Sequence, residues 1–268
     1  MSSRSLQDLF HLVNQAVPEA QNLVTVTADT LVQDALDIMF ENNFSQLPVL
    51  EGDQVLGVFS HRSFLKDFGN KGKNPASLPV EEFLEDLKFA HAKDVLPDLL
   101  DEFELKGSVL VGSEDNLVGV VTTTDALRFF YEIASPYVVL RAIELSIREL
   151  MRASVSESTL RECIERCLAQ HYRKNDRKLP TAIEELSFSD YVMILRYKGT
   201  WVHFQDQFGG NAELTYTKLK DLPDLRNDVF HFKREIQVDE YHDLITCRNW
   251  LLKRIKKLEA KVSGKNYA

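Results

Sequence analysis

The chain has few residues that could cross-link a fold or hold a structural metal. Its 268 residues include only three cysteines, Cys163, Cys167 and Cys247, with no CxxC pair and no Cys/His ligand spacing. This pattern argues against structural zinc and favours a reducing compartment, for which we expect the cytoplasm. Cys163 and Cys167 are four residues apart, so we interpret them as small core residues on one helix.

Long hydrophobic runs are also missing. No stretch approaches 18 apolar residues, so the sequence predicts no segment that spans a membrane. No continuous apolar segment follows Arg4, which argues against a signal peptide. We expect an amphipathic helix within residues 1–20 instead, with its apolar positions at Leu6, Leu9, Phe10 and Val13.

Positive charge is scarce in the first half of the chain. Residues 1–135 hold 9 Lys and Arg against 22 Asp and Glu, whereas residues 136–268 hold 23 against 19. Because the first half is strongly acidic and the second half is mildly basic, a polyanion is expected to bind the second half. The length and the hydrophobic content of 44% predict two domains, each with its own core.

The first half contains a repeat with a constant offset of 62 residues. Residues 46–68 align without gaps on residues 108–130, and each copy reads as an apolar strand, a polar turn, a second apolar strand and the start of a helix. A further helix is expected before each copy, over residues 30–42 and about 93–105. We expect these two helices to bury one stripe each, formed by Val32, Leu36 and Phe40 and by Val95, Leu99 and Phe103.

This duplicated unit resembles a pair of CBS domains, whose members associate through their sheets and bind adenosine-containing ligands in the clefts between them. The family motif is Gly, two apolar residues, Thr or Ser, two residues of any kind, and Asp. Residues 119–125 match it in full, with Gly119, Thr122 and Asp125, whereas the first copy has Ser63 in place of the Asp. The resemblance implies a βαββα pair over residues 21–135, divided at about 75 and 76.

The motif residues suit a nucleotide. Gly119 permits close approach to the backbone, the helix after Thr122 directs N–H groups at an anion, and Asp125 can accept from ribose hydroxyls. We expect an adenine nucleotide, such as AMP or ATP, as a regulatory ligand. In the first copy, the candidate phosphate contacts are Ser60, His61 and Arg62.

A second interpretation of the motif needs no ligand. Thr122 and Asp125 also have the spacing of a capping box, in which each side chain bonds to the backbone of the other residue. The sequence leaves both interpretations open.

From Pro136 onward the apolar spacing becomes helical, and residues 136–268 are expected to form an all-α bundle. The expected fold class is therefore α+β, with a short, stiff joint at residues 135–136. We expect short helices over 188–198 and 201–208, broken at Gly199 and at Gly209–Gly210. The aromatic residues at helical spacing are interpreted as core rather than as a base-stacking surface: Trp201, Phe204 and Phe208.

Residues 226–231 carry the strongest chemical signal in the second half. Arg226 can hold a phosphate bidentately, and the imidazole of His231 can move a proton. On a helix these two residues lie about 140° apart, whereas Asn227 and His231 share a face. A second copy related by a two-fold axis could bring the groups together, so we expect a site at a homodimer interface.

The pattern of Arg226, Asn227 and His231 resembles the signature of the HEPN superfamily of helical ribonucleases. The resemblance implies that the RNA 2′-hydroxyl attacks its own phosphate without metal or any other cofactor. The products would be a 2′,3′-cyclic phosphate and a 5′-hydroxyl. Some members carry Tyr two residues after the His, where this chain has Lys233. The leading hypothesis is a metal-independent endoribonuclease regulated by an adenine nucleotide.

Three alternatives stay open. Arg226 and His231 can be surface residues in ion pairs with Asp224 or Asp228. The protein can be a non-enzymatic nucleotide sensor whose helical domain binds RNA or a protein. A regulatory subunit of a transporter or channel ranks last, because it leaves residues 226–231 unexplained. The sequence specifies neither the nucleotide nor the direction of regulation.

Overall fold

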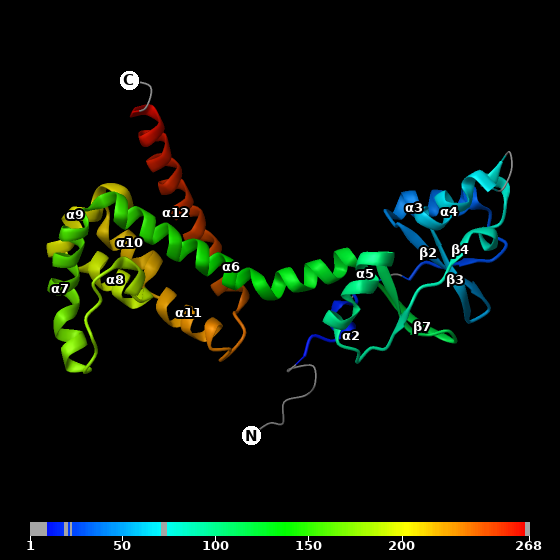
Figure 1. The fold of residues 1–268 in the computed structure, drawn as a ribbon, viewed down its shortest axis with the longest axis horizontal. Coiled ribbons are helices and arrows are strands. Elements are labelled where there is room, and N and C mark those ends of the chain that lie inside the picture. Colours follow the sequence, from blue (N-terminus) through cyan, green and yellow to red (C-terminus); the bar gives the residue numbers. More distant parts are fainter. Residues whose placement is uncertain (1–9, 19–20, 22, 71–73, 266–268) are drawn as a thin grey trace. The chain divides into compact units, whose positions relative to one another are not determined.

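The computed structural model describes residues 10–18, 21, 23–70 and 74–265. It divides into an N-terminal unit, residues 1–131, and a C-terminal unit, residues 132–268 (Figure 1). Of the helix expected near the amino terminus, Leu6 and Leu9 lie outside the described residues. The described part of that region contains α2 (Val13–Ala16), whose Val13 and Ala16 are buried.

The N-terminal unit contains two small sheets in its described residues. One sheet has the order β1 (Val26–Thr27), β2 (Gln46–Glu51), β3 (Gln54–Ser60) and β4 (Leu84–Glu85). The other has the order β5 (Phe89–Ala90), β6 (Ser108–Ser113) and β7 (Asn116–Thr122). In each sheet the first strand is parallel to the second, and the next pairing is antiparallel.

The strand register confirms the repeat. Every Cα pair between β2 and β3 becomes a pair between β6 and β7 when both numbers increase by 62, as Gln46–Ser60 becomes Ser108–Thr122. Even the irregularity recurs, after Val49 in one copy and after Val111 in the other. The two copies therefore share one backbone design.

Helices cover these sheets (Figure 1). The α-helices are α3 (Val32–Asn42), α4 (His61–Asp67) and α5 (Leu100–Lys106). The short 3-10 helices are η1 (Phe68–Asn70), η2 (Pro75–Ser77), η3 (Val80–Phe83) and η4 (Leu96–Leu99).

The helix expected over 93–105 forms as η4 followed by α5, with Pro97 in the first turn of η4. The expectation that Phe40 is buried was wrong, because its side chain is 88% exposed. The buried stripe of α3 runs through Val32, Ala35 and Met39 instead, at i, i+3 and i+7.

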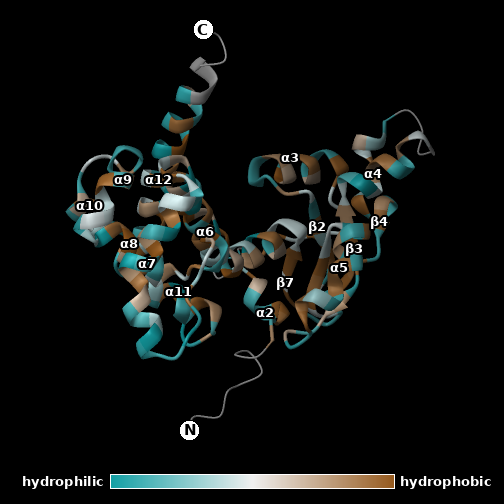
Figure 2. Ribbon diagram, turned by 60° about the vertical axis from the view of Figure 1, so that its left-hand side comes forward, coloured by the Kyte–Doolittle hydropathy of each residue, from teal (hydrophilic) through white to brown (hydrophobic). Residues whose placement is uncertain are grey.

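Each sheet has its own apolar core, and a third cluster joins the two sheets. This third cluster contains Val58 of β3 and its counterpart Val120 of β7, together with Leu110 of β6. Strand β7 is largely hydrophobic (Figure 2). The two copies therefore associate through apolar residues of their sheets.

Helix α6 (Thr123–Ser154) begins directly after Thr122, the threonine of the second motif, and continues into the C-terminal unit. Pro136 lies inside it and has no N–H to donate to the carbonyl of Glu132. The hydroxyl of Ser135 donates to that carbonyl at 3.2 Å. The side chain of Ser135 thus supplies a hydrogen bond at the point where the backbone cannot.

In the described part of the C-terminal unit, every secondary-structure element is a helix. The helices are α7 (Glu157–Lys174), η5 (Ile183–Glu185), α8 (Phe188–Arg196), α9 (Lys198–Phe208), α10 (Ala212–Leu219), α11 (Leu222–Phe230) and α12 (Val238–Lys265), together with most of α6. Their hydrophobic faces (Figure 2) pack into one core cluster. Phe204 and Phe208 are buried there, and the half-buried Trp201 packs against it, as predicted.

The helix break expected at Gly199 lies two residues earlier. The chain leaves α8 at Tyr197, which has extended backbone angles, and Gly199 lies within the first turn of α9. Gly209 ends α9 with a φ of 94°, in the left-handed region that favours glycine.

The three cysteines contribute to this unit as packing residues. Cys163 and Cys247 are buried, and Cys167 is half-buried. Burial raises the pKa of all three thiols, that of Cys247 to about 12. Such thiols stay protonated near neutral pH and are weak nucleophiles.

Candidate functional sites

The second motif forms a capping box at the start of α6. The backbone N–H and the hydroxyl of Thr122 both donate to Oδ2 of Asp125, at 3.0 and 2.6 Å. The N–H of Asp125 donates back to the Thr122 hydroxyl at 3.2 Å. The other oxygen, Oδ1, has no hydrogen-bond partner among the described residues. The cap therefore uses only one of the two carboxylate oxygens of Asp125.

Gly119 approaches the side chain of Gln21. Oε1 of Gln21 accepts from the N–H of Val120 at 2.9 Å, and Nε2 donates to the Val120 carbonyl at 2.7 Å. A Cβ atom at position 119 would lie 2.7 Å from that Oε1. The amide of Gln21 thus extends the edge of β7, as β4 extends the edge of β3. The sequence pattern gave no indication of this contact.

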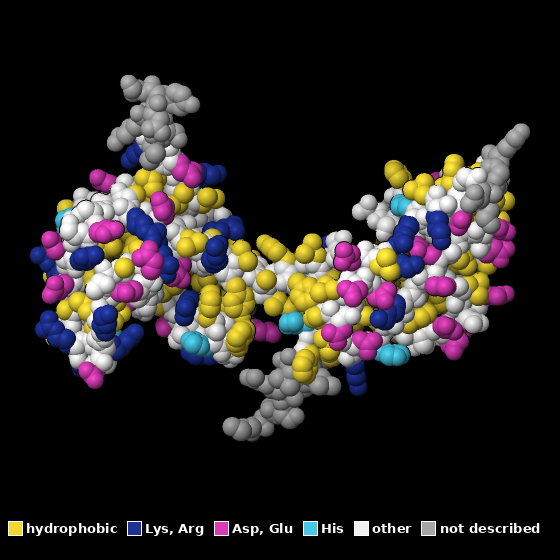
Figure 3. All heavy atoms as spheres, viewed as in Figure 1, with side chains coloured by type: hydrophobic (Ala, Val, Ile, Leu, Met, Phe, Trp, Pro, Cys, Tyr) yellow, Lys and Arg dark blue, Asp and Glu magenta, His cyan; other side chains and the backbone are white. Residues whose placement is uncertain are grey.

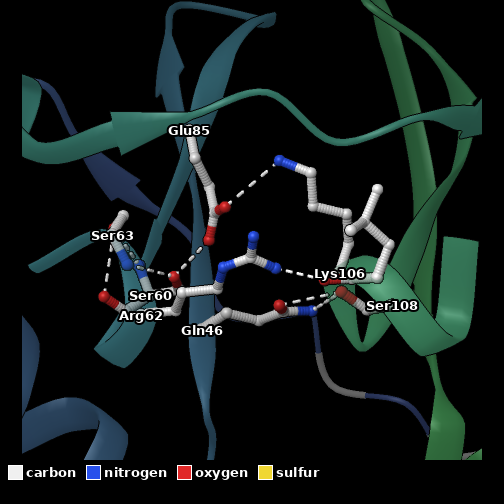
Figure 4. Close-up of polar contacts among 8 residues, drawn as sticks. Gln46, Ser60, Arg62, Ser63, Glu85, Lys106 and Ser108 are labelled. Atoms are coloured by element: carbon white, nitrogen blue, oxygen red, sulfur yellow. Dashed lines mark hydrogen bonds and ion pairs between the residues drawn. The ribbon is translucent and has the colours of Figure 1, made fainter. Parts of the chain in front are cut away.

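The first motif lies in a network of polar contacts (Figure 4). Ser60 and Ser63 form a capping box at the start of α4. The Ser60 hydroxyl also donates to Oε1 of Glu85, whose Oε2 lies 3.4 Å from Nζ of Lys106. Glu85 and Lys106 belong to β4 and α5, and neither was a candidate from the sequence.

The other two candidates of the first copy lie at the surface. The Arg62 guanidinium donates to the carbonyl of Leu105, and the side chain of His61 is exposed. Beside this network, the hydroxyl of Ser108 lies 2.5 Å from Nε2 and 2.8 Å from Oε1 of Gln46 (Figure 4). Because these two residues are separated by the repeat offset of 62, their contact joins equivalent positions of the two copies.

The Arg/His motif of the C-terminal unit lies on α11 and the residue that follows it. The guanidinium carbon of Arg226 lies 4.6 Å from the centre of the Phe230 ring. His231 caps the helix, is exposed, and donates its backbone N–H to the carbonyl of Asn227 at 3.2 Å. The motif is therefore helical almost to its end.

In the part of the chain that the structure describes, the acidic residues next to Arg226 and His231 in the sequence form their ion pairs with other cations or with none. Within the described residues, neither the Arg226 nor the His231 side chain forms an ion pair. Asp228 pairs instead with Lys233 at 3.6 Å and with Arg234 at 2.9 Å. This arrangement does not match the alternative in which Asp224 or Asp228 holds the motif residues in surface ion pairs.

Arg226 and Asn227 line a cavity of about 370 Å³ in the C-terminal unit. Glu144 and Arg148 of α6 line the same cavity, and His231 is not among its lining residues. The structure thus brings two of the three candidate residues to one cavity, and the third, His231, is exposed and does not line it.

Arg148 is a further cation in this cavity that the sequence pattern did not identify. Its Nε donates to the hydroxyl of Tyr191 at 2.7 Å, and its Nη2 pairs with Glu144. Burial alone would lower the pKa of Arg148, but the bonds to Tyr191 and Glu144 outweigh it and raise the pKa. Glu144 and Arg148 are four residues apart, a spacing that is equally typical of an exposed helix pair.

An aromatic patch lies next to the motif. We define it as Tyr137, Phe230 and Phe232. The ring centre of Tyr137 lies 5.4 Å from that of Phe230 and 6.2 Å from that of Phe232. Phe232 is 75% exposed and has a φ of 51°, which is rare for a bulky residue. Hydrophobic side chains gather over this end of α11 (Figure 3).

In the described part of the chain, no group of three or more His, Cys, Asp or Glu side chains could hold a metal ion. None of the described helices is both long and apolar enough to cross a membrane.

Comparison with known proteins identifies part of the N-terminal unit. Residues 19–70 match the model of the CBS domain family, so the chain contains a CBS domain. The second copy repeats the strand register of the first at an offset of 62 residues.

Curated relatives match a limited part of the chain. An A-adding tRNA nucleotidyltransferase from Geobacter sulfurreducens is 28% identical in an alignment of 134 residues, and the match covers 44% of this chain and 15% of the relative. An inosine-5′-monophosphate dehydrogenase from Methanocaldococcus jannaschii is 27% identical in an alignment of 132 residues, and the match covers 46% of this chain and 26% of the relative. The chain therefore spans about a quarter or less of these relatives.

Solved structures give a similar coverage. A CBS domain protein of unknown function from Thermoplasma acidophilum is 27% identical with a TM-score of 0.40, covering 44% of this chain and 68% of that one. CBSX2 in complex with AMP is 24% identical with a TM-score of 0.40, covering 46% of this chain and 98% of that one.

Proposed function

We propose that this protein is an endoribonuclease of the HEPN type whose activity is controlled by an adenine nucleotide bound to its CBS pair. The observation that carries the proposal is the placement of Arg226. Its guanidinium lines a cavity with Asn227 and Arg148 and forms no ion pair among the described residues, while His231 is exposed nearby. A guanidinium without an ion-pair partner and an imidazole five positions further along the chain are groups that suit phosphate chemistry.

The residues have distinct roles in the proposed reaction. Arg226 binds the scissile phosphate and stabilises its developing charge, and Asn227 orients the substrate or the imidazole. His231 takes the proton of the 2′-hydroxyl as that oxygen bonds to phosphorus, and the 5′-oxygen leaves with a proton returned by an imidazolium. The products are a 2′,3′-cyclic phosphate and a 5′-hydroxyl, and no metal takes part.

A second copy of the chain completes this site. Arg226 and His231 lie about 140° apart around a helix axis, so one copy does not direct both groups at one phosphate. The aromatic patch lies directly beside them and exposes Phe232. Burying it against a two-fold related copy would remove apolar surface from water and would pair the two motifs.

The regulatory part of the proposal rests on the second motif. Oδ1 of Asp125 can accept from a ribose hydroxyl while Oδ2 keeps the cap. The AMP bound to CBSX2 supports an adenine nucleotide as the ligand. Helix α6 begins next to this motif and also carries Glu144 and Arg148. Regulation requires that the nucleotide bind one arrangement of the dimer more tightly than another.

Cleavage of a mixed RNA with and without EDTA tests the proposal. We expect cleavage that persists under chelation, gives cyclic phosphate ends, and is lost in Arg226→Ala and His231→Ala. Lys220→Ala is a matched control, because it removes an exposed cation that lies outside the cavity and the motif. If both motif variants cleave RNA as well as the wild type, the assignment is wrong.

One observation favours the second candidate, a non-enzymatic nucleotide sensor whose helical unit binds RNA or a protein. The cavity also contains Glu144, Glu184 and Asp224, and these carboxylates oppose a polyanion. Intact RNA together with measurable RNA or protein binding would identify this function.

A further inference from the structure

The carboxylate of Glu85 occupies a position built for an anion. The hydroxyl of Ser60 donates to one of its oxygens, and the ammonium group of Lys106 lies 3.4 Å from the other (Figure 4). The side chain of Glu85 is 15% exposed and that of Lys106 is 25% exposed, so both are largely removed from water. A hydroxyl donor and a cation are the groups that also bind a phosphate.

The protein itself satisfies the groups around this position. Ser60 and Ser63 bond to each other's backbone, and Arg62 donates to the carbonyl of Leu105. An incoming anion would therefore have to displace Glu85 before it could reach Ser60 or Lys106.

Among the described residues, no carboxylate from outside the motif reaches the motif hydroxyl of the second copy. By the repeat offset of 62 residues, the counterpart of Glu85 is Leu23. Leu23 is half-buried against the apolar cluster between the sheets. Thr122 is the counterpart of Ser60, and it bonds to Asp125 on its own helix. The two copies thus share one backbone register, but the carboxylate that accepts from the motif hydroxyl belongs to β4 in the first copy and to the helix that follows the motif in the second.

We propose that Glu85 is an internal ligand that closes the first cleft of the CBS pair to phosphate-bearing ligands, so that each chain binds one nucleotide at Thr122 and Asp125. The stoichiometry rests on the proposed nucleotide binding, whereas the closure of the first cleft does not. A fixed negative charge beside Ser60 and Lys106 repels a second anion and also occupies its donors.

Removing this carboxylate opens the first cleft. Glu85→Ala empties the position, and Glu85→Gln keeps the side-chain volume while it removes the charge. We expect inorganic pyrophosphate to bind the full-length Glu85→Ala protein at least about tenfold more tightly than the wild type. Adding Lys106→Ala should abolish the gain, because it removes the cation that would hold the anion.

A change in net charge is controlled for by Glu81→Ala. Glu81 is exposed and lies on the same segment, and its side chain has no hydrogen bond or ion pair among the described residues. This variant should bind pyrophosphate as weakly as the wild type. Calorimetric titration measures both affinity and stoichiometry, and thermal unfolding shows whether each variant is folded.

The outcomes separate this inference from the proposed function. The inference is overturned if neither Glu85→Gln nor Glu85→Ala gains pyrophosphate binding, or if the wild type already binds two AMP molecules per chain. A gain of pyrophosphate binding in proteins that never bind AMP would uphold the role of Glu85 and reject nucleotide regulation. One AMP per wild-type chain and two per Glu85→Ala chain would support both.

Discussion

The candidate motifs of the two units differ in whether their polar side chains have partners within the protein. In the first repeat of the N-terminal unit, Ser60 and Ser63 cap a helix and Glu85 bonds to Ser60. In the C-terminal unit, Arg226 and His231 have no ion-pair partner among the described residues, and the nearby Asp228 is held by Arg234. A motif whose hydrogen bonds the protein itself supplies stabilises the fold, whereas the Arg226 guanidinium has no ion-pair partner among the described residues and is the phosphate contact in the proposed function.

The largest expected effect comes from comparing one exposed aromatic residue of each unit. We expect Phe232→Asp to lower the RNA cleavage rate about hundredfold, because a charge in the aromatic patch separates the two copies and misaligns the paired motifs. Sedimentation velocity should show a shift toward monomer. Phe40→Asp is the control, because Phe40 is 88% exposed in the N-terminal unit and lies far along the chain from the motif. Equal loss in both variants would reject a special role for the patch.

The capping role of Asp125 can be separated from its proposed ligand contact by giving the second motif the serine that the first motif has. Asp125→Ser reproduces the arrangement at Ser63, where a serine completes the capping box. We expect AMP to bind at least about tenfold more weakly while the free energy of unfolding changes by about 0.5 kcal/mol or less. Asp125→Ala should lose about 1 kcal/mol in addition, because it also removes the cap. Unchanged AMP binding in Asp125→Ser would leave the carboxylate with a capping role alone.

The helical core also contains a buried hydrogen bond between two side chains, and a substitution can remove it. The hydroxyl of Tyr172 donates to Oδ2 of Asp190 at 2.8 Å. We expect Tyr172→Phe to cost about 1–2 kcal/mol in the free energy of unfolding, measured with urea. Tyr191→Phe is the comparison, because its hydroxyl touches Arg148 in the cavity and should also affect activity. No loss of stability in Tyr172→Phe would show that this bond is not needed.

The same tyrosine predicts an alkaline transition. Burial and the bond to Asp190 raise the pKa of Tyr172 to about 12. Because the folded value lies above the ordinary value of 10, the contribution is present below pH 10 and is lost as the pH rises through about 12. The stability difference between the wild type and Tyr172→Phe should therefore shrink over this range.

The smallest expected effect concerns an ion pair after α11. The bonds from Arg234 and from the N–H of Gln237 lower the pKa of Glu240 to about 2. This contribution is present above the ordinary pKa of 4.5 and is lost as the pH falls through about 2. Glu240→Gln should be slightly less stable than the wild type at pH 6 and equally stable at pH 2, whereas Glu235→Gln should match the wild type at both.

Much of the fold could be predicted from spacing. The offset of 62 residues predicted the pairing of both hairpins, because an apolar strand, a turn and a second strand fix the register locally. The core roles of Phe204 and Phe208 followed from helical spacing. Phe40 was assigned wrongly, because Phe40 and Met39 both fit an apolar face and packing against the sheet buries Met39.

The candidate sites were predictable only in part. Thr122 and Asp125 were recognised together because their spacing is local, and so were Arg226 and Asn227. Glu85 and Lys106 were missed, because they reach Ser60 from other elements of the chain. Arg148 was missed because a Glu and an Arg four residues apart are common on exposed helices.

The sequence by itself determined the elements, the repeat and the residues suited to nucleotide and phosphate chemistry, since these depend on groups a few positions apart. Only the tertiary structure decided which polar groups are already occupied. It placed Glu85 on Ser60, Gln21 against Val120 and Arg148 beside Arg226 in one cavity. These pairs of residues are 25, 99 and 78 positions apart, and chain folding rather than local spacing brings them into one region.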